Sequence, residues 1–322
     1  MTVRGPGFKV RAALMALAAF LAGCGERAPG AKPRELRIFH AAGLTPVLDA
    51  IRDGCERDLN LKLLAEASGS QTACRKVTEL GRQCDLVMLA DNELVAALLP
   101  GACSWRLDFA NDEIVIGIGV RAPDASKTEQ NWADALTQDG VRLGRVDENL
   151  GPLGYRTLLV WKLQELRGAP ELSARLRARC VKVVDDVGTL APLLKTGELD
   201  YAFLYRSSCI AWDIRHIELD QSINLGAHDV DYSAAVVTFE KYKSGSKETV
   251  TIRGAPVAWT LTIPDRGANA SLAAEFARCL LTRRTDVLEK NGVRLMRKPL
   301  FYGPDRSFTP FRDFAEYAGS LK

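Results

Sequence analysis

Short apolar runs alternate with amphipathic patterns along most of the chain. The run at 36–41 has the composition of a strand, and after a turn Val47, Leu48 and Ile51 recur at the spacing of one helix face. The same order of strand, loop and helix returns from residue 61 onward, which is typical of a mostly parallel sheet covered by helices. Further strands are predicted at 61–65, 85–90, 141–146, 181–184 and 201–205, and further helices at 72–80, 132–136, 153–166, 190–194, 272–281 and 285–290.

Two apolar segments are predicted to cross between two halves of the chain. The first is the long run at 113–120, and the second is the alternating segment at 258–263. A chain of 322 residues fits about two domains of roughly 150 residues each. We therefore predict an α/β fold of two lobes, each a mixed, mostly parallel sheet flanked by helices. Lobe I is expected at 36–116 and 257–322 and lobe II at 117–256, with the polar stretch at 241–248 as a hairpin tip or loop.

The first 23 residues have the pattern of an export signal. Three basic residues accompany an apolar run at 12–22, which is too short for a bilayer that needs about 20 apolar residues. The sequence Leu21-Ala22-Gly23-Cys24 resembles a bacterial lipobox, which implies cleavage before Cys24, a diacylglycerol on its sulfur and residues 24–35 as a tether. The alternative is a plain signal peptide with a chance cysteine. We expect a lipid-anchored protein on the periplasmic or extracellular side of the membrane.

Charge and cysteine content narrow the class of function. Without the three basic residues of the signal, the chain has 40 basic and 40 acidic residues. It therefore lacks the excess of positive charge that is typical of a nucleic-acid-binding protein. Seven cysteines remain besides Cys24, so disulfides are permitted after export and at least one thiol is left over. Cys55 and Cys84 are one candidate pair. No spacing of Cys and His residues predicts a zinc site.

Small and hydroxyl-bearing residues follow the predicted strands at their carboxyl ends. These ends share one edge of a parallel sheet, where helix N-termini and hydroxyls hold anions. An arginine can add a charge-assisted hydrogen bond. No nucleophile with a His and Asp partner set is visible, so we expect binding rather than catalysis, with no cofactor and no metal. The predicted ligand contacts are Gly43, Ser70, Leu153, Gly154, Tyr155, Arg156 and Tyr205.

Each candidate has a structural alternative. Ser70 belongs to a Ser-Gly-Ser turn that would also cap a helix. Arg156 would also serve in an ion pair, and the two tyrosines would also pack between lobes with satisfied hydroxyls. Asp185 and Asp186, together with Asp200, suggest a divalent-metal site, but the adjacent pair is more simply interpreted as the cap of the next helix.

The same segments carry a family resemblance. They run in one order from about residue 36 to 292 and include Phe39-His40-Ala41, Ser68-Gly69-Ser70, Leu153-Gly154-Tyr155-Arg156, Gly197-Glu198-Leu199-Asp200-Tyr201 and Tyr205-Arg206-Ser207. This set is similar to the tungstate- and molybdate-binding proteins of ABC importers. The resemblance implies a type II periplasmic binding fold that closes on an oxyanion and delivers it to a membrane permease encoded elsewhere. We expect the protein to be a monomer.

The chain departs from the family's ligand set in three places. The first loop has Ala42-Gly43 where the family has Gly-Ser, so one hydroxyl is missing, and the family's two carboxylate ligands fall on Gly151 and Val187. Ser70 and Tyr205 match. The resemblance therefore implies a hydrogen-bonded tetrahedral oxyanion rather than a six-coordinate centre. Two alternatives stay open, namely another small anion such as phosphate, sulfate or an organic acid, and a periplasmic sensor or partner protein that does not transport.

Overall fold

The structure of the protein is a computed structural model that describes residue 1 and residues 32–123, 131–241 and 248–321. The predicted signal and lipobox lie outside these residues, as do most of the tether and most of the stretch at 241–248. Residues 34–322 form one compact unit. None of its described helices combines the length and the apolar character needed to cross a membrane.

Seven strands form the sheet of lobe I, in the order β14-β13-β4-β12-β3-β1-β2. Strand β1 pairs in parallel with β2 and β3, whereas β12 is antiparallel to β3 and β4, and β13 is antiparallel to β4. The sheet is therefore mixed. Its strands are β1 (Arg34–Ala41), β2 (Leu61–Ser68), β3 (Leu86–Leu89), β4 (Arg106–Asp112), β12 (Val257–Thr262), β13 (Arg294–Tyr302) and β14 (Glu316–Gly319).

Helices cover this sheet because each has an apolar face that must be buried. Helix α1 (Thr45–Leu59) buries Val47, Leu48 and Ile51 and ends at Asn60, which adopts the left-handed conformation of a helix end. The predicted helical spacing is thus confirmed there. The other helices of this lobe are η1 (Ala42–Leu44), α2 (Ser70–Thr78), α3 (Glu93–Leu98), α10 (Ala270–Arg283), α11 (Thr285–Lys290), α12 (Asp305–Phe308) and η2 (Thr309–Phe311).

Five strands form the sheet of lobe II, in the order β7-β6-β8-β5-β9. Strands β6, β7 and β8 are parallel, and β5 is antiparallel to β8 and β9. The central strand β8 (Tyr201–Tyr205) is buried along its length, as its apolar run predicts. The other elements are β5 (Ile114–Ile118), β6 (Leu143–Val146), β7 (Cys180–Val184), β9 (His216–Glu218), the pair β10 (Val236–Glu240) and β11 (Thr249–Arg253), and helices α5 (Trp132–Ala135), α6 (Pro152–Leu166), α7 (Leu172–Arg179), α8 (Val187–Thr196) and α9 (Arg206–Ala211).

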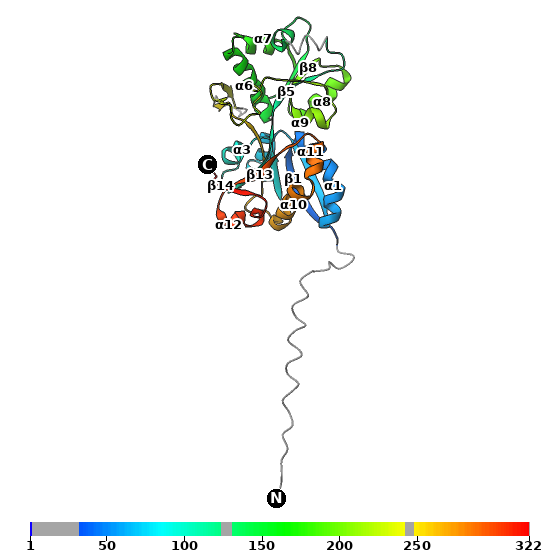
Figure 1. The fold of residues 1–322 in the computed structure, drawn as a ribbon, viewed down its shortest axis with the longest axis vertical. Coiled ribbons are helices and arrows are strands. Elements are labelled where there is room, and N and C mark those ends of the chain that lie inside the picture. Colours follow the sequence, from blue (N-terminus) through cyan, green and yellow to red (C-terminus); the bar gives the residue numbers. More distant parts are fainter. Residues whose placement is uncertain (2–31, 124–130, 242–247, 322) are drawn as a thin grey trace. The chain divides into compact units, whose positions relative to one another are not determined.

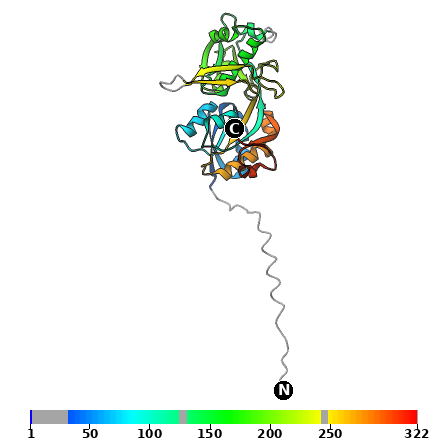
Figure 2. The ribbon, with the colours of Figure 1, turned by 90° about the vertical axis from the view of Figure 1, so that its left-hand side faces the viewer.

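The chain passes between the two sheets twice (Figure 1). The first passage is at Glu113, between β4 in one sheet and β5 in the other, and the second is at 254–256, between β11 and β12. Figure 2 shows the same two passages from the side. Both predicted crossing segments are strands, but each lies within one sheet, and the chain passes between the lobes just before it. The predicted two-lobe fold class is confirmed. The lobe limits at 116/117 and 256/257 stay a prediction.

The predicted pairing of Cys55 with Cys84 is wrong. The Sγ of Cys55 on α1 lies 3.4 Å from the Sγ of Cys279 on α10. Cys84 instead belongs to a separate apolar cluster that also contains Cys74 and Cys103. The partner of Cys55 is decided by the packing of α1 on α10, which lies more than two hundred residues further along the chain and leaves no local signal in the sequence.

Candidate functional site

A small cavity lies between the two lobes, where strands of both sheets end. Its volume is about 20 Å³, which is room for about one water molecule. In open α/β sheets this edge is where ligands bind. Lobe I contributes Ala41, Ala42, Gly43, Ser68, Gly69, Ser70, Ala90 and Trp259 to the lining, and lobe II contributes Val146, Gly151, Pro152, Leu153, Asp186, Val187 and Tyr205.

Three helices begin at the wall of this cavity. Helix α2 begins at Ser70, α6 at Pro152 and α8 at Val187. The first N–H groups of a helix have no partner within the helix, and the helix dipole favours negative charge at this end. Proline is accommodated at the start of α6 because a first-turn N–H has no intrahelical acceptor. Since α2 belongs to lobe I and the other two helices to lobe II, donors approach the cavity from both sides.

The hydroxyl groups of Ser70 and Tyr205 at the wall keep their own protons available. The Oγ of Ser70 accepts the backbone N–H of Ala90 at 3.1 Å, and the Oη of Tyr205 accepts from Nη1 of Arg156 at 3.0 Å. Within the described residues neither hydroxyl donates to a protein acceptor, so each keeps a proton for a ligand. Burial raises the pKa of Tyr205 to about 12, which keeps its phenol protonated at neutral pH.

A buried ion pair joins the lobes beside the cavity. Arg156 of α6 places Nη2 3.1 Å from Oδ2 of Asp91, in the loop after β3. Arg156 also donates to the carbonyl oxygen of Ala90, and Tyr155 donates its hydroxyl to Asp91. The side chain of Arg156 is 4% exposed and that of Asp91 is 10% exposed, so each charge depends on the other for compensation. The network orients Tyr205 and holds α6 against lobe I.

Two glycines allow backbone segments to approach closely. A Cβ on Gly69 would lie 2.0 Å from the carbonyl oxygen of Leu150, across the gap between the lobes. A Cβ on Gly154 would lie 2.5 Å from the carbonyl carbon of Asp147. Both positions therefore require glycine for steric reasons. Gly69 sets how near the lobes come, and Gly154 seats the first turn of α6.

The structure brings four of the seven predicted contacts to the cavity wall. These four are Gly43, Ser70, Leu153 and Tyr205. Gly154 packs on the backbone before α6, and its amide donates to the carbonyl oxygen of Gly151 at 2.9 Å. Tyr155 and Arg156 reach across to Asp91 instead of lining the cavity. Their position beside the cavity makes them positioning residues for Tyr205 and for the approach of the lobes.

Eleven of the fifteen lining residues are not among the predicted contacts, and two of these eleven have side chains that matter for the chemistry of the site. Trp259 on β12, which offers no polar signal in the sequence, has its ring centre 5.4 Å from that of Tyr205 and closes one side. Asp186 precedes α8, where its side chain makes no capping hydrogen bond, and it lines the cavity. The two positions to which the family resemblance assigns carboxylates, Gly151 and Val187, line the cavity as well. Asp186 is thus the one carboxylate in the described lining.

The donor set of the wall suits an anion. Nowhere in the described ranges do three His, Cys, Asp or Glu side chains gather as a metal site would require. Asp200, a candidate partner of Asp185 and Asp186, instead accepts from Arg142, whose Nη2 lies 2.5 Å from its Oδ1. The polar groups at the wall are helix N-termini, hydroxyls and a single carboxylate, and the N–H and O–H donors among them can hold an oxyanion by hydrogen bonds.

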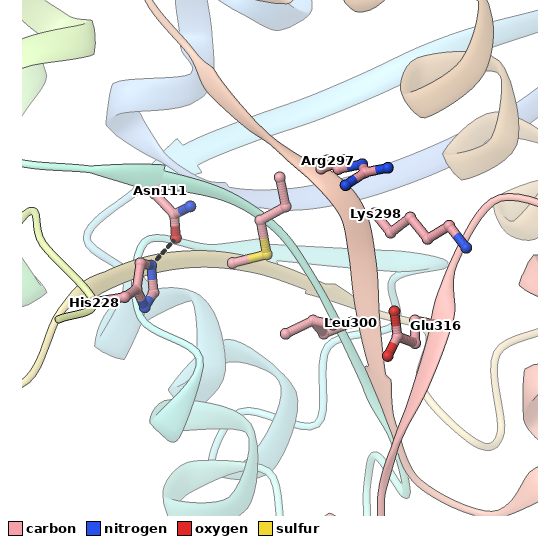
Figure 3. Close-up of a pocket in the computed structure, with 7 residues that line it drawn as sticks. Asn111, His228, Arg297, Lys298, Leu300 and Glu316 are labelled. Carbon is pink, nitrogen blue, oxygen red and sulfur yellow. Dashed lines mark hydrogen bonds between the residues drawn. The ribbon is translucent and has the colours of Figure 1, made fainter.

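A larger hollow lies elsewhere, where β13 bulges away from β4. Its volume is about 580 Å³. Figure 3 shows His228 hydrogen-bonded to Asn111 at 2.7 Å at one end of the hollow, with Lys298 and Glu316 at the other. Arg297 and Lys298 are exposed, and no hydroxyl-bearing residue belongs to the lining. Its charged groups are solvated, and it has none of the features that orient donors in the smaller cavity.

Two mixed sheets joined by two passages, with a cavity at the strand ends between them, define a type II periplasmic binding protein. The periplasmic molybdate-binding protein of Azotobacter vinelandii shares this fold, with a TM-score of 0.60 at 15% identity over 81% of this chain and 99% of that one. A family profile described as "Bacterial extracellular solute-binding protein" matches residues 36–294. The chain belongs to this family of extracellular solute-binding proteins, as the resemblance in its sequence predicts.

Two relatives match almost the whole chain. The molybdate/tungstate-binding protein WtpA of Pyrococcus abyssi is 29% identical over 92% of this chain and 95% of its own length. A putative ABC transporter molybdenum-binding protein of Haloferax volcanii is 31% identical over 88% of each chain. The family consists of extracytoplasmic binding proteins and is not a family of enzymes.

Proposed function

We propose that this protein captures a small oxyanion of the tungstate or molybdate type between its lobes and delivers it to the permease of an ABC importer. The carrying observation is that Ser70 from lobe I and Tyr205 from lobe II each keep a hydroxyl proton for the same cavity, among three helix N-termini. A fully deprotonated oxyanion only accepts hydrogen bonds, so it needs a wall of donors. The names of the Pyrococcus and Haloferax relatives support this choice of ligand.

In this proposal the anion is held by hydrogen bonds alone. Gly151 and Val187 carry no side-chain oxygen, and the absence of two negative charges makes the wall more favourable to an anion. A cavity of about 20 Å³ is smaller than an anion of five heavy atoms, so the lobes must open to admit it and close with the loops set further apart. Contacts from both lobes then favour the closed form when the anion is bound.

The same proposal includes how the protein is exported and anchored to the membrane. Residues 1–23 serve as the export signal, Cys24 carries the lipid, and residues 24–35 tether the binding unit to the membrane. The protein acts as a monomer without a cofactor and without catalysis, since its work is to bind and release. The two lobes, with limits near the predicted 116/117 and 256/257, are the two bodies that close on the anion.

Asp186 favours hydrogen phosphate as a second candidate ligand. A carboxylate at the wall repels a fully deprotonated anion but accepts the proton that hydrogen phosphate still carries at neutral pH. The two ligands therefore predict opposite effects of Asp186→Asn. The substitution strengthens the binding of tungstate or molybdate because it removes a negative charge, and it weakens the binding of phosphate because a neutral amide oxygen is a weaker acceptor for the P–OH group than a carboxylate is.

Thermal unfolding with added anions tests both candidates. Wild-type protein and the Asp186→Asn variant are heated with tungstate, molybdate, sulfate or phosphate. Ligand at 100 times its dissociation constant stabilises the folded state by about 2.7 kcal/mol. We expect stabilisation by tungstate or molybdate that grows in the variant. Stabilisation by phosphate that is lost in the variant would establish the second candidate, and no shift with any of the four would overturn the oxyanion proposal.

A further inference from the structure

A second buried hydroxyl of lobe II lies beside the cavity. Ser208 of α9 is fully buried, and within the described residues its Oγ has no hydrogen-bond partner. Burying a hydroxyl without a partner is unfavourable, and native proteins rarely leave one so, which means that each case calls for an explanation. The neighbouring Ser207 differs in this respect, because its hydroxyl donates to Asp112.

The surroundings of Ser208 tie it to the cavity. A Cβ on Gly43 would lie 3.3 Å from the Oγ of Ser208, 3.0 Å from the ring of Trp259 and 3.6 Å from Val187. Gly43, Trp259 and Val187 all line the cavity. Glycine at position 43 therefore leaves open the space in front of the Ser208 hydroxyl, because the Cβ of any other residue at position 43 would contact that hydroxyl.

We propose that the Ser208 hydroxyl is a further ligand contact, which donates its proton to the bound oxyanion. This inference rests on the proposed function and extends it to a further binding residue. Together with Ser70 and Tyr205, Ser208 gives the cavity three hydroxyl donors from two lobes. The third donor lies next to the first loop, where the glycine itself supplies no hydroxyl.

The test compares Ser208→Ala with the wild type by titration calorimetry, using tungstate, molybdate, sulfate and phosphate as probes. For the anion that the wild type binds, Ser208→Ala should weaken binding by about 10- to 100-fold, the range expected when a hydrogen bond to a charged group is lost. Ser208→Thr keeps the hydroxyl and should retain most of the affinity. Ser173→Ala on α7, which contributes nothing to the lining, is the matched control and should bind as the wild type does.

Stability without added anion separates a ligand contact from a structural role. Removing an unpartnered buried hydroxyl should leave the melting temperature of Ser208→Ala at or above that of the wild type. A melting temperature well below it, or unchanged affinity in a variant that melts normally, would overturn the assignment of Ser208. If the wild type binds none of the four anions, the proposed function fails instead, so the two failures are distinguishable.

An independent observation concerns the two thiols in contact within lobe I. Cys55 and Cys279 are both buried, their sulfurs are 3.4 Å apart, and they join helices α1 and α10. The family is extracytoplasmic, where disulfides form and persist. A disulfide needs the sulfurs to approach to about 2.05 Å.

We infer that Cys55 and Cys279 form a disulfide in the exported protein. The two thiols lose two protons and two electrons to the disulfide of a thiol oxidant, which leaves as a dithiol. Burial raises the pKa of Cys55 to about 12, so the thiolate that attacks the oxidant is scarce once the helices pack. The bond is therefore made while the chain folds, before α1 and α10 close over the pair.

Peptide mapping of exported full-length protein tests this bond. Free thiols are alkylated in denaturant without reductant, and a Cys55–Cys279 linked peptide pair is expected. Refolding the wild type with reductant should lower its melting temperature by about 5 °C or more, whereas the double variant Cys55→Ala, Cys279→Ala should be insensitive to reductant. Cys209→Ala, at a buried cysteine in lobe II, should keep the wild-type response. Complete alkylation of both residues, or equal melting with and without reductant, would contradict the inference.

Discussion

The cavity between the lobes and the hollow beside β13 differ in almost every respect. The hollow measures about 580 Å³ and is lined largely by exposed side chains on and around one strand, whereas the cavity measures about 20 Å³ and is closed by residues from both lobes. The hollow displays Arg297 and Lys298 to solvent. The cavity has no lysine or arginine in its described lining but gathers helix starts and the hydroxyls of Ser70 and Tyr205.

Under the proposed function, this difference means that oriented donors, rather than volume or charge, make the binding site for a small anion. A charge in water is screened, while an amide or hydroxyl that is fixed and shielded keeps its full effect on a buried anion. Arg156, which lies beside the cavity, is neutralised by Asp91 and donates to the hydroxyl of Tyr205. The predictions below test this contrast in order of decreasing effect.

Arg156→Ala should have the largest effect. The substitution leaves Asp91 buried without its charge partner, which costs about 3–5 kcal/mol in comparable cases, and it removes the donor that orients Tyr205. Chemical denaturation should show the loss of stability, and calorimetry should show the loss of anion binding. Arg278→Ala, which breaks a pair with Asp313 at the surface, is the matched control and should alter both far less. Equal effects of the two variants would contradict the role given to the buried pair.

Asp112→Asn should change the pH dependence of stability. Asp112 ends β4, and burial raises its pKa from 3.8 to about 6 against the hydrogen bond from Ser207. Because the folded state holds this proton more tightly than the unfolded chain does, its contribution to stability is complete below about pH 4 and is lost as the pH rises through 6. The variant should therefore gain about 2 kcal/mol relative to the wild type between pH 4 and pH 7.

Asp220 is the control for this pH profile, because its pKa is lowered in the folded state whereas that of Asp112 is raised. Hydrogen bonds from Ser222, and after them one from Arg167, lower the pKa of Asp220 to about 2. Its ionised form stabilises the folded state above about pH 4, and that contribution is lost as the pH falls toward 2. Asp220→Asn should thus lose stability relative to the wild type at neutral pH and recover it in acid. Parallel profiles for Asp112→Asn and the wild type would show that the carboxyl of Asp112 is not buried as described.

Tyr205→Phe tests the hydroxyl donor itself. Loss of a hydrogen bond to a charged ligand should weaken anion binding by about 10- to 100-fold in a calorimetric titration. Stability should change less, because Arg156 keeps Asp91 and the carbonyl of Ala90. Tyr317→Phe removes an exposed hydroxyl that bonds Gly303 in lobe I and should leave affinity unchanged. Wild-type affinity in Tyr205→Phe would remove this residue from the site.

Gly69→Ala tests how closely the lobes must approach. Its added methyl would meet the carbonyl oxygen of Leu150 at 2.0 Å, so the two segments must separate. Overpacking of this kind costs about 1–3 kcal/mol, which corresponds to roughly 10- to 100-fold in the affinity of a ligand held by both lobes. Small-angle scattering with saturating anion should show a less closed particle. Affinity and scattering equal to the wild type would mean that this contact does not limit closure.

The double variant Arg297→Ala, Lys298→Ala should have the smallest effect. It removes both positive charges from the hollow while leaving the cavity intact. Anion affinity should stay within about twofold of the wild type, because exposed charges are largely screened at physiological salt. A tenfold loss at that salt concentration would reverse the contrast between the two regions.

The sequence predicts the parts of this protein in which local pattern and chain order suffice. Strand β8 and helix α6 follow from apolar runs, and the loops with Ser70 and Tyr205 follow from their places after strands. Strand β13 could not be predicted in this way. It contains Arg294, Arg297, Lys298 and Pro299 and bulges in the middle, so neither alternation nor a continuous apolar run marks it.

A residue of the site can be predicted from the sequence only where its role depends on residues close to it in the chain. Arg156 has an obvious charge, but whether it meets a ligand or a carboxylate depends on Asp91, which lies 65 residues earlier and in the other lobe. Trp259 carries no polar signal at all, and it reaches the cavity because β12 lies beside β3 in the sheet. Such long-range pairings are set by packing, which the pattern of one segment does not record.

Titration calorimetry of the mature protein with tungstate and molybdate is the most direct test of the central claim, which is that donors from both lobes hold one oxyanion. The account predicts one anion per protein, bound with micromolar or tighter affinity by the wild type. It also predicts that the double variant Ser70→Ala, Tyr205→Phe loses this binding while it still folds. No binding by the wild type, or equal binding by the double variant, would contradict the account.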